Sequence, residues 1–290
     1  MEYIYLGISL LAGAGKGLCT KKISNIVKTF KGTVYITMIR MVLCVAIGFF
    51  AVAASGINNF ATNLQVLMIS ALSGISTSAF IIAWIACVRK GSYVMLDVFT
   101  MLGVGITVTL CKVFFDEPIS TNQYAGFLLL LVSTIIMCSY NSSIKTKLSI
   151  KSLFMLIICC IFSGISDFSQ KLFIYKAVNP NIATFNFYSY VFSAIFLFIC
   201  NFIKNHEHHD GKNQRAILLI LLTALCLFAN TYFKTLAARS INSAVLYPLA
   251  TGINFILSVI MSSVFFKEKA TLKCIIGVSI TFISLIIINL

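Results

Sequence analysis

Long apolar runs separated by short polar segments form the main pattern along the chain. A helix needs about 20 mostly apolar residues to cross a bilayer. Runs of about this length lie near 4–20, 33–53, 64–86, 91–112, 121–139, 152–174, 182–203, 215–237, 243–265 and 272–289. Short connections favour antiparallel packing of neighbouring helices. The pattern predicts an all-α integral membrane protein with ten transmembrane helices, with nine as the alternative.

Composition agrees with this pattern and excludes several classes of protein. Of the 290 residues, 59% are hydrophobic and 10% are charged. A soluble domain has about 45–50% apolar and about 25% charged residues, because its surface must still face water. A soluble enzyme, a disordered chain and a fibrous protein are therefore excluded.

The net charge of +14 has two explanations. It is typical of nucleic-acid-binding proteins, but no such motif is present, and basic residues also collect in short cytoplasmic loops of membrane proteins. The odd-numbered connections hold 15 Lys or Arg residues, against 5 in the even-numbered ones and their flanks. The positive-inside rule therefore predicts odd-numbered connections in the cytoplasm and both termini outside.

The sequence repeats itself at an offset of 151 positions. Residues 113–117 read VFFDE and residues 264–268 read VFFKE. Gly126 falls on Gly277 and Ser133 on Ser284, and residues 94–138 share 11 identities with residues 245–289. Internal duplication explains this echo better than shared apolar composition does.

The duplication predicts the domain organisation. We expect a first five-helix repeat over 1–140, a linker over 141–151 and a second repeat over 152–290. Because each repeat has an odd number of spans, the second enters the bilayer in the opposite sense. Such inverted repeats build many alternating-access transporters, with the substrate site between the repeats near the midplane. The alternative is a purely architectural duplication.

These features resemble the EamA family of the drug/metabolite transporter superfamily. The similarity is strongest from Ala237 to Ile288, where Pro248, Glu268 and Gly277 occupy the positions of the family's proline, acid and glycine. Glu117 and Gly126 match in the first half, although Asp97 stands at the equivalent of Pro248. The resemblance covers the whole chain in architecture and about one third of it in motif.

The resemblance implies a secondary transporter of small organic molecules without nucleotide hydrolysis. It also implies that both termini are cytoplasmic, which conflicts with the charge count. Glu117 and Glu268 are expected to cap helices or pair locally rather than to bind substrate. Helices 3, 4, 8 and 9 line the cavity in the family, which makes Trp84, Asn230 and Tyr247 cavity candidates.

Ionisable residues within the spans are costly and are therefore functional candidates. At a rise of about 1.5 Å per residue, Lys16, Arg40 and Asp97 lie at similar depths towards the odd-numbered connections. We expect a buried pair of Asp97 with one of the two cations. The alternative for Lys16 and Arg40 is snorkelling to the interface.

Asp167 is the repeat equivalent of Lys16 and is expected on the other side of the midplane. A depth difference of about 12 Å makes direct pairing of these two residues unfavourable. The hypothesis is that Asp167 responds to protons or cations, because a carboxyl group in a low-dielectric cavity exchanges protons near neutral pH. Lys234 is expected to snorkel, and Lys171 to mark the interface end of its helix.

The sequence predicts no metal site, cofactor or catalytic residue. The segment GAGKG fails the phosphate-loop pattern, and the His206–Asp210 cluster is expected to be solvated rather than to bind a metal. The spans contain no histidine, which argues against catalysis. The expected partners are a small-molecule substrate and the lipid bilayer, not nucleic acid, and the expected oligomeric state is a monomer or homodimer.

The sequence therefore favours a non-enzymatic, multi-pass transporter in the cell membrane. Its expected cargo is a small polar or amphipathic metabolite, either an amino-acid-like compound or an organic cation, moved by proton-coupled or other gradient-coupled alternating access. Import and export are not distinguished. A membrane-embedded enzyme, or a flippase or accessory protein for lipid-linked substrates, is the alternative.

Overall fold

A computed structural model describes residues 2–26, 29–88, 93–141, 150–177, 181–202, 214–266 and 272–289. Within these ranges the fold is all-helical, with ten α-helices and one short 3-10 helix. The α-helices are α1 (Glu2–Ile26), α2 (Phe30–Ser55), α3 (Leu64–Val88), α4 (Tyr93–Phe115), α5 (Thr121–Asn141), α6 (Ile150–Lys176), α7 (Ile182–Phe202), α8 (Gln214–Ala237), α9 (Ser243–Phe266) and α10 (Leu272–Asn289), and the 3-10 helix η1 spans Ile57–Phe60. The ten predicted helices are therefore all present.

Polar residues fix several helix starts by accepting hydrogen bonds from exposed backbone N–H groups. Asn63 caps α3 through the N–H of Val66, and Asn242 caps α9 through the N–H of Ala244. At the start of α5, the Ser120 hydroxyl accepts from the N–H of Gln123, whose side chain accepts from the N–H of Ser120. This reciprocal arrangement is a capping box, which fixes where the helix begins.

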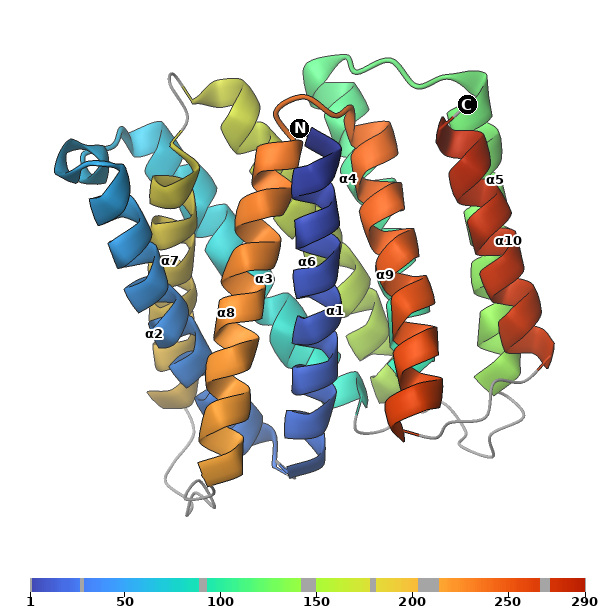
Figure 1. The fold of residues 1–290 in the computed structure, drawn as a ribbon, viewed down its shortest axis with the longest axis horizontal. Coiled ribbons are helices and arrows are strands. Elements are labelled where there is room, and N and C mark those ends of the chain that lie inside the picture. Colours follow the sequence, from blue (N-terminus) through green and yellow to red (C-terminus); the bar gives the residue numbers. More distant parts are fainter. Residues whose placement is uncertain are drawn as a thin grey trace.

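Successive helices run in opposite directions through the molecule (Figure 1). The helix ends flanking the odd-numbered connections lie at the bottom of that view, and those flanking the even-numbered connections lie at the top. Both marked ends of the chain also lie at the top. The alternation expected from the ten apolar runs is therefore present in the helix directions.

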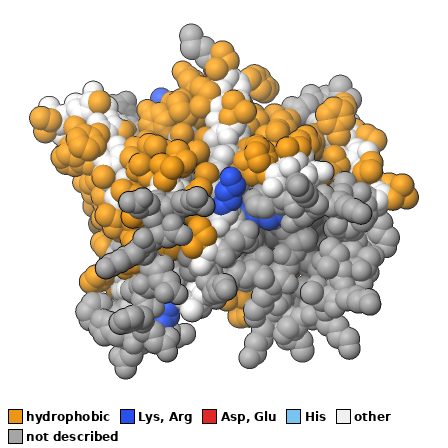
Figure 2. Space-filling model, turned by 60° about the horizontal axis from the view of Figure 1, so that its bottom comes forward, with side chains coloured by type: hydrophobic (Ala, Val, Ile, Leu, Met, Phe, Trp, Pro, Cys, Tyr) orange, Lys and Arg blue, Asp and Glu red, His pale blue; other side chains and the backbone are white. Residues whose placement is uncertain are grey.

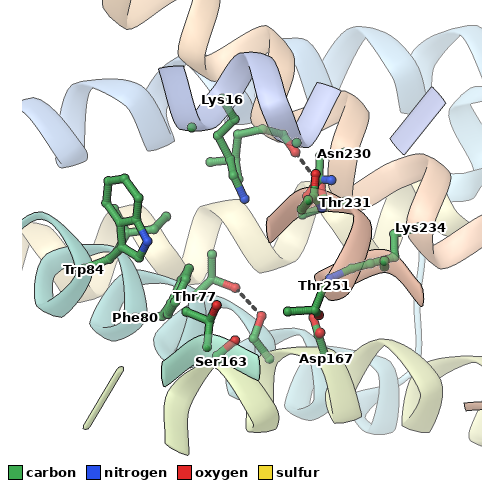
Figure 3. Close-up of a pocket in the computed structure, with 18 of the residues that line it drawn as sticks. Lys16, Thr77, Phe80, Trp84, Ser163, Asp167, Asn230, Thr231, Lys234 and Thr251 are labelled. Carbon is green, nitrogen blue, oxygen red and sulfur yellow. Dashed lines mark hydrogen bonds and ion pairs between the residues drawn. The ribbon is translucent and has the colours of Figure 1, made fainter. Parts of the chain in front are cut away.

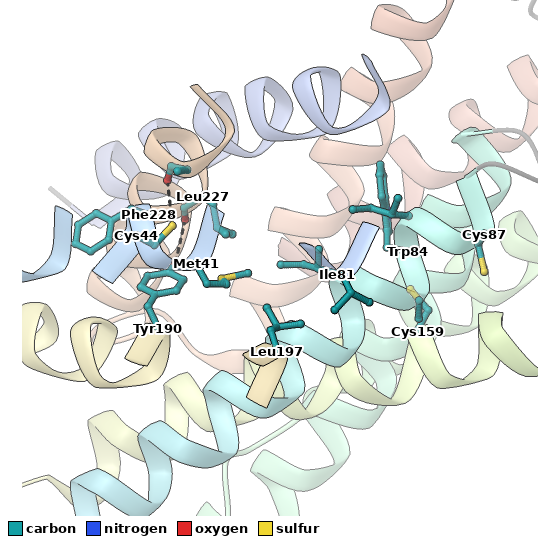
Figure 4. Packing of buried hydrophobic residues seen from close by; sticks show 14 of the residues in the cluster. Met41, Cys44, Ile81, Trp84, Cys87, Cys159, Tyr190, Leu197, Leu227 and Phe228 are labelled. Carbon is teal, nitrogen blue, oxygen red and sulfur yellow. Dashed lines mark hydrogen bonds between the residues drawn. The ribbon is translucent and has the colours of Figure 1, made fainter. Parts of the chain in front are cut away.

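Helices from the two halves of the chain pack against each other rather than forming separate bundles. The most extensive pairings are α1 with α8, α3 with α6, α5 with α10, α2 with α7 and α4 with α6; α3 also packs against α7, and α4 against α9. One large apolar cluster joins helices of both halves and includes Met41, Trp84, Cys159, Tyr190 and Phe228 (Figure 4). The molecule therefore has an interior shared by both halves, in which a site between them can be built.

The contact between α5 and α10 shows a reciprocal pattern. The hydroxyl of Ser133 donates to the carbonyl of Gly277 at 2.8 Å, and the hydroxyl of Ser284 donates to the carbonyl of Gly126 at 2.7 Å. These four residues are the equivalents predicted from the offset of 151. The glycines allow the close approach, since a Cβ on Gly126 would collide with Ile288.

Six of the described helices are long and apolar enough to cross a membrane, namely Lys31–Ser55, Leu64–Ile85, Phe154–Lys176, Ile182–Asn201, Ile217–Ala237 and Ser243–Phe265. The described parts of α4 and α10 give shorter apolar stretches, Thr100–Phe115 and Ile275–Ile288. Hydrophobic side chains cover much of the described surface (Figure 2). Leu11, Phe50 and Val113 are at least 70% exposed, an arrangement that suits contact with lipid.

Candidate functional site

A cavity of about 160 Å³ lies between helices of the two halves. Its wall is formed by α1, α2, α3 and α4 from the first half and by α6, α8 and α9 from the second. Charged, amide and hydroxyl groups share this wall with aromatic and aliphatic ones. Its lining residues include Lys16, Thr20, Arg40, Thr77, Phe80, Trp84, Thr100, Ser166, Asp167, Gln170, Asn230, Lys234, Thr251 and Asn254.

Asp167 forms an ion pair with Lys234 in the cavity wall. The Nζ atom of Lys234 lies 2.5 Å from Oδ1 of Asp167, and each side chain is 14% exposed. The expectation that Lys234 snorkels to the interface is therefore wrong, because α8 contacts α6 and the ammonium group of Lys234 pairs with a largely buried carboxylate on α6. The charge of Asp167 is therefore compensated by a partner that the sequence did not predict.

Tyr247 helps to hold this ion pair in place. It is fully buried, and its hydroxyl donates to the backbone carbonyl of Asp167 at 2.9 Å. The Nζ atom of Lys234 lies 5.9 Å from the centre of the Tyr247 ring, within cation–π range. Tyr247 therefore positions the pair and does not itself line the cavity.

Lys16 and Trp84 reach the cavity from two different helices. In Figure 3 the Lys16 side chain on α1 points its nitrogen into the space between Trp84 and Asn230. Trp84 is only 8% exposed and belongs to both the cavity wall and the main apolar cluster. Trp84, a predicted cavity candidate, lies in the cavity wall, and so does Lys16, which the sequence singled out by its depth in a span.

Asn230 lines the cavity and also joins α8 to α1. Its amide nitrogen donates to the carbonyl of Ser9 at 2.8 Å, and the hydroxyl of Ser9 donates to the carbonyl of Asn230 at 3.0 Å. Such interhelical hydrogen bonds hold helices together within a membrane. The amide nitrogen of Asn230 therefore has a structural role.

Arg40 is buried rather than snorkelling. Its side chain lines the cavity, yet the residue is only 3% exposed. One terminal nitrogen, Nη1, donates to the hydroxyl of Thr20 at 3.4 Å. The other two nitrogens, Nε and Nη2, are buried without a hydrogen-bond partner in the described part of the chain. The guanidinium group is thus held inside the protein with most of its hydrogen-bonding capacity unused.

Several cavity residues were not predicted as site residues. The hydroxyls of Thr77 on α3 and Ser166 on α6 are hydrogen-bonded at 2.8 Å across the wall. The oxygens of the Gln170 and Asn254 side chains are buried without a partner among the described residues. Uncharged polar residues are common in membrane helices, so residue type alone does not identify them as cavity residues. The repeat gives a weak indication, because the equivalent threonines Thr100 and Thr251 both line the cavity.

A second charged cluster lies at the end of the molecule that carries the even-numbered connections. Lys171 on α6 lies 3.1 Å from Oε1 of Glu117, with the two side chains 5% and 6% exposed. Lys171 also donates to the carbonyls of Ala238 and Ile241. Lys171 therefore does not mark a solvated interface, because a carboxylate and two carbonyls hold it inside the protein.

The carboxylate of Glu117 also caps α9. Its Oε2 atom accepts from the backbone N–H of Ser243 at 3.0 Å and from the Ser243 hydroxyl. Burial alone raises the pKa of Glu117, but the hydrogen bonds from Ser243 and the charge of Lys171 outweigh it, and the pKa lies below its ordinary value. Glu117 thus pairs with Lys171 and caps α9, although both partners are distant from it in the sequence.

The remaining predicted positions fall into two groups. Pro248 lies within α9, and Gly126 and Gly277 lie buried where α5 packs against α10. Glu268 and the His206–Asp210 cluster lie outside the described residues, and Asp97 lies on α4 with a side chain outside the described part. Their predicted roles stay predictions. In the described part, no group of three or more metal-binding side chains is present.

Comparisons with known proteins agree with this architecture. Residues 150–290 match the family model described as the EamA-like transporter family. No curated protein matches the chain. Among the similar solved chains, one protein crystal structure has a TM-score of 0.77 at 11% identity, covering 99% of this chain and 95% of that chain. This likeness concerns the fold alone.

The family match and the apolar helices together identify the class of protein. The Pro248 and Gly277 motif lies within the matched residues, and six described helices are suited to crossing a bilayer. Residues 150–290 of this multi-pass membrane protein are similar to the EamA-like transporter family, which belongs to the drug/metabolite transporter superfamily.

Proposed function

We propose that this protein is a secondary transporter of the cell membrane that moves a small polar or amphipathic metabolite by alternating access. The observation that carries the proposal is the cavity of about 160 Å³, which is lined by both halves of the chain and holds charged groups at membrane depth. Ionisable residues are retained in membrane interiors mainly where they serve substrates, ions or protons.

An inverted repeat of ten spans supports this mechanism. Under the offset of 151, the pair α1 with α8 becomes the pair α6 with α3, and both are main contacts. The hydrogen bonds of Ser133 and Ser284 exchange in the same way. A pseudo-twofold relation of this kind gives two arrangements of similar energy, one open to each side of the membrane.

The Asp167–Lys234 pair is the proposed coupling element. Protonation of Asp167 would remove the partner of Lys234, so the pair is more stable in one protonation state than in the other. A conformational change that separates α6 from α8 would then be linked to proton binding. In the described part of the chain, the titratable side chains placed near Asp167 are Lys234, Tyr247 and Cys111.

Proteoliposomes containing the purified protein test this function. A broad panel of metabolites is offered with and without an imposed pH gradient, and empty liposomes serve as the control. We expect saturable movement of at least one solute, accelerated by the gradient. Absence of transport with every solute, together with turnover or flipping of a lipid-linked substrate, would overturn the proposal.

A further inference from the structure

The cavity contains more positive than negative charge. Among its described lining residues, Lys16, Arg40 and Lys234 are cations and Asp167 is the carboxylate. The chain has 8 acidic residues in all. By sequence position, Asp97 is the other acid within a predicted span. Even if Asp97 faced the cavity, three cations would face two carboxylates.

Arg40 shows where the excess positive charge is concentrated. The nitrogens without a partner in the described part, Nε and Nη2, form one edge of the guanidinium plane, and Nη1 makes the contact with Thr20. The Nε–Nη2 edge presents two parallel N–H groups, the geometry that binds both oxygens of a carboxylate. A buried guanidinium group without a counter-charge is energetically unfavourable, and binding of an anion would relieve this cost.

We infer that the transported solute carries a carboxylate group and that Arg40 receives it. This inference rests on the proposed transport function and narrows its substrate class from organic cations and amino-acid-like compounds to carboxylates. Both nitrogens of the free edge are shielded in this structure. Binding therefore requires the Arg40 side chain to turn towards the cavity and to release the long 3.4 Å contact with Thr20.

The rest of the cavity limits the solute further. Its volume of about 160 Å³ is close to that of protein cavities that hold a benzene-sized molecule. Lys16 points into the same space, and Trp84 and Phe80 provide aromatic faces. The inferred solute is thus a small carboxylate with an apolar or aromatic part, and a zwitterionic amino acid belongs to this class.

The test compares carboxylates with matched carboxamides. Small organic acids and amino acids, each paired with its primary amide, are added to the purified protein in detergent, and ligand-induced shifts in Tm give the affinities. The amide keeps size and shape but removes the charge and one acceptor. We expect carboxylates to bind about tenfold or more tightly than their amides, and the same preference in proteoliposome uptake.

Variants assign this preference to Arg40. Arg40→Gln is expected to reduce carboxylate affinity about tenfold or more, and Arg40→Lys to recover part of the loss, because it keeps the charge but not the paired donors. Lys112→Gln is the control, because Lys112 is an exposed cation that lies outside the cavity. Without ligand, Arg40→Gln is expected to keep or raise Tm, because it removes a buried charge without a partner.

The outcomes separate this inference from the proposed function. Transport of organic cations or amides in preference to carboxylates, or unchanged carboxylate affinity in Arg40→Gln, overturns the inference and leaves the transport function standing. A fall in the Tm of ligand-free Arg40→Gln with an unchanged preference for carboxylates assigns Arg40 a structural role and also overturns it. Carboxylate binding without movement of any solute supports the inference and contradicts the transport function.

Discussion

Within the described ranges, two buried ion pairs hold opposite charges together, and each joins different segments of the molecule. Asp167 and Lys234 connect α6 to α8 at the cavity, whereas Glu117 and Lys171 connect the segment after α4 to α6 at one end of the molecule. Removing one member of a buried pair leaves the other charge without a partner, which costs more than removing both. Each pair therefore gives a specific prediction.

For the cavity pair, we expect Asp167→Asn to destabilise the protein by about 3 kcal/mol, because Lys234 loses its counter-charge. The double variant Asp167→Asn/Lys234→Met is expected to recover most of this loss. Thermal unfolding in detergent measures both effects. Additive destabilisation in the double variant would show that the two residues act independently.

The same substitution tests coupling. If Asp167 carries the proton, transport by Asp167→Asn should lose its acceleration by an imposed pH gradient while exchange of solute across the membrane continues. Uptake and exchange in proteoliposomes provide the measurement. Retention of the wild-type dependence on the gradient would rule out Asp167 as the coupling group.

For Glu117, the prediction concerns acid stability. Because its pKa in the folded protein lies below the ordinary value, its carboxylate stabilises the fold above about pH 4.3, and this stabilisation is lost as the pH falls through the folded-state pKa. We expect Glu117→Gln to lower Tm at pH 7 and to reduce the acid-induced decrease in Tm. Parallel Tm-against-pH curves for the variant and the wild type would contradict this.

At the scale of helices, close packing of α5 and α10 depends on Gly126. We expect Gly126→Val to destabilise the protein by about 1–3 kcal/mol, because the added side chain collides with Ile288 and approaches the carbonyl of Ser284. Gly105→Val is the matched control, since a Cβ there meets nothing within 4 Å. Equal changes in Tm for the two variants would show that helix propensity, not packing, decides the outcome.

At the scale of the whole molecule, the helix directions place both ends of the chain on one face (Figure 1). Single cysteines added at each end are expected to react with an impermeant thiol reagent from the same side of sealed vesicles. Labelling from opposite sides would contradict the helix directions. The side that reacts also decides between the outward termini expected from basic residues and the cytoplasmic termini implied by the family.

The sequence by itself determined that this is a multi-helix membrane protein, because apolar runs of bilayer length have no other favourable environment. It also identified Lys16, Arg40, Asp167, Trp84 and Asn230, all of which line the cavity. Ionisable and amphipathic groups within membrane spans are energetically costly, so such candidate residues can be recognised from the sequence alone.

Only the tertiary structure decided which groups meet. The pairing of Asp167 with Lys234 depends on how α6 and α8 lie side by side, and depth along each helix contains no information about lateral neighbours. Lys234 appeared close enough to an interface to snorkel, and Glu117 gave no indication that it would reach both Lys171 and α9. Likewise, the two unused donors of Arg40 depend on which side chains surround it. The sequence of α2 alone does not reveal these neighbours.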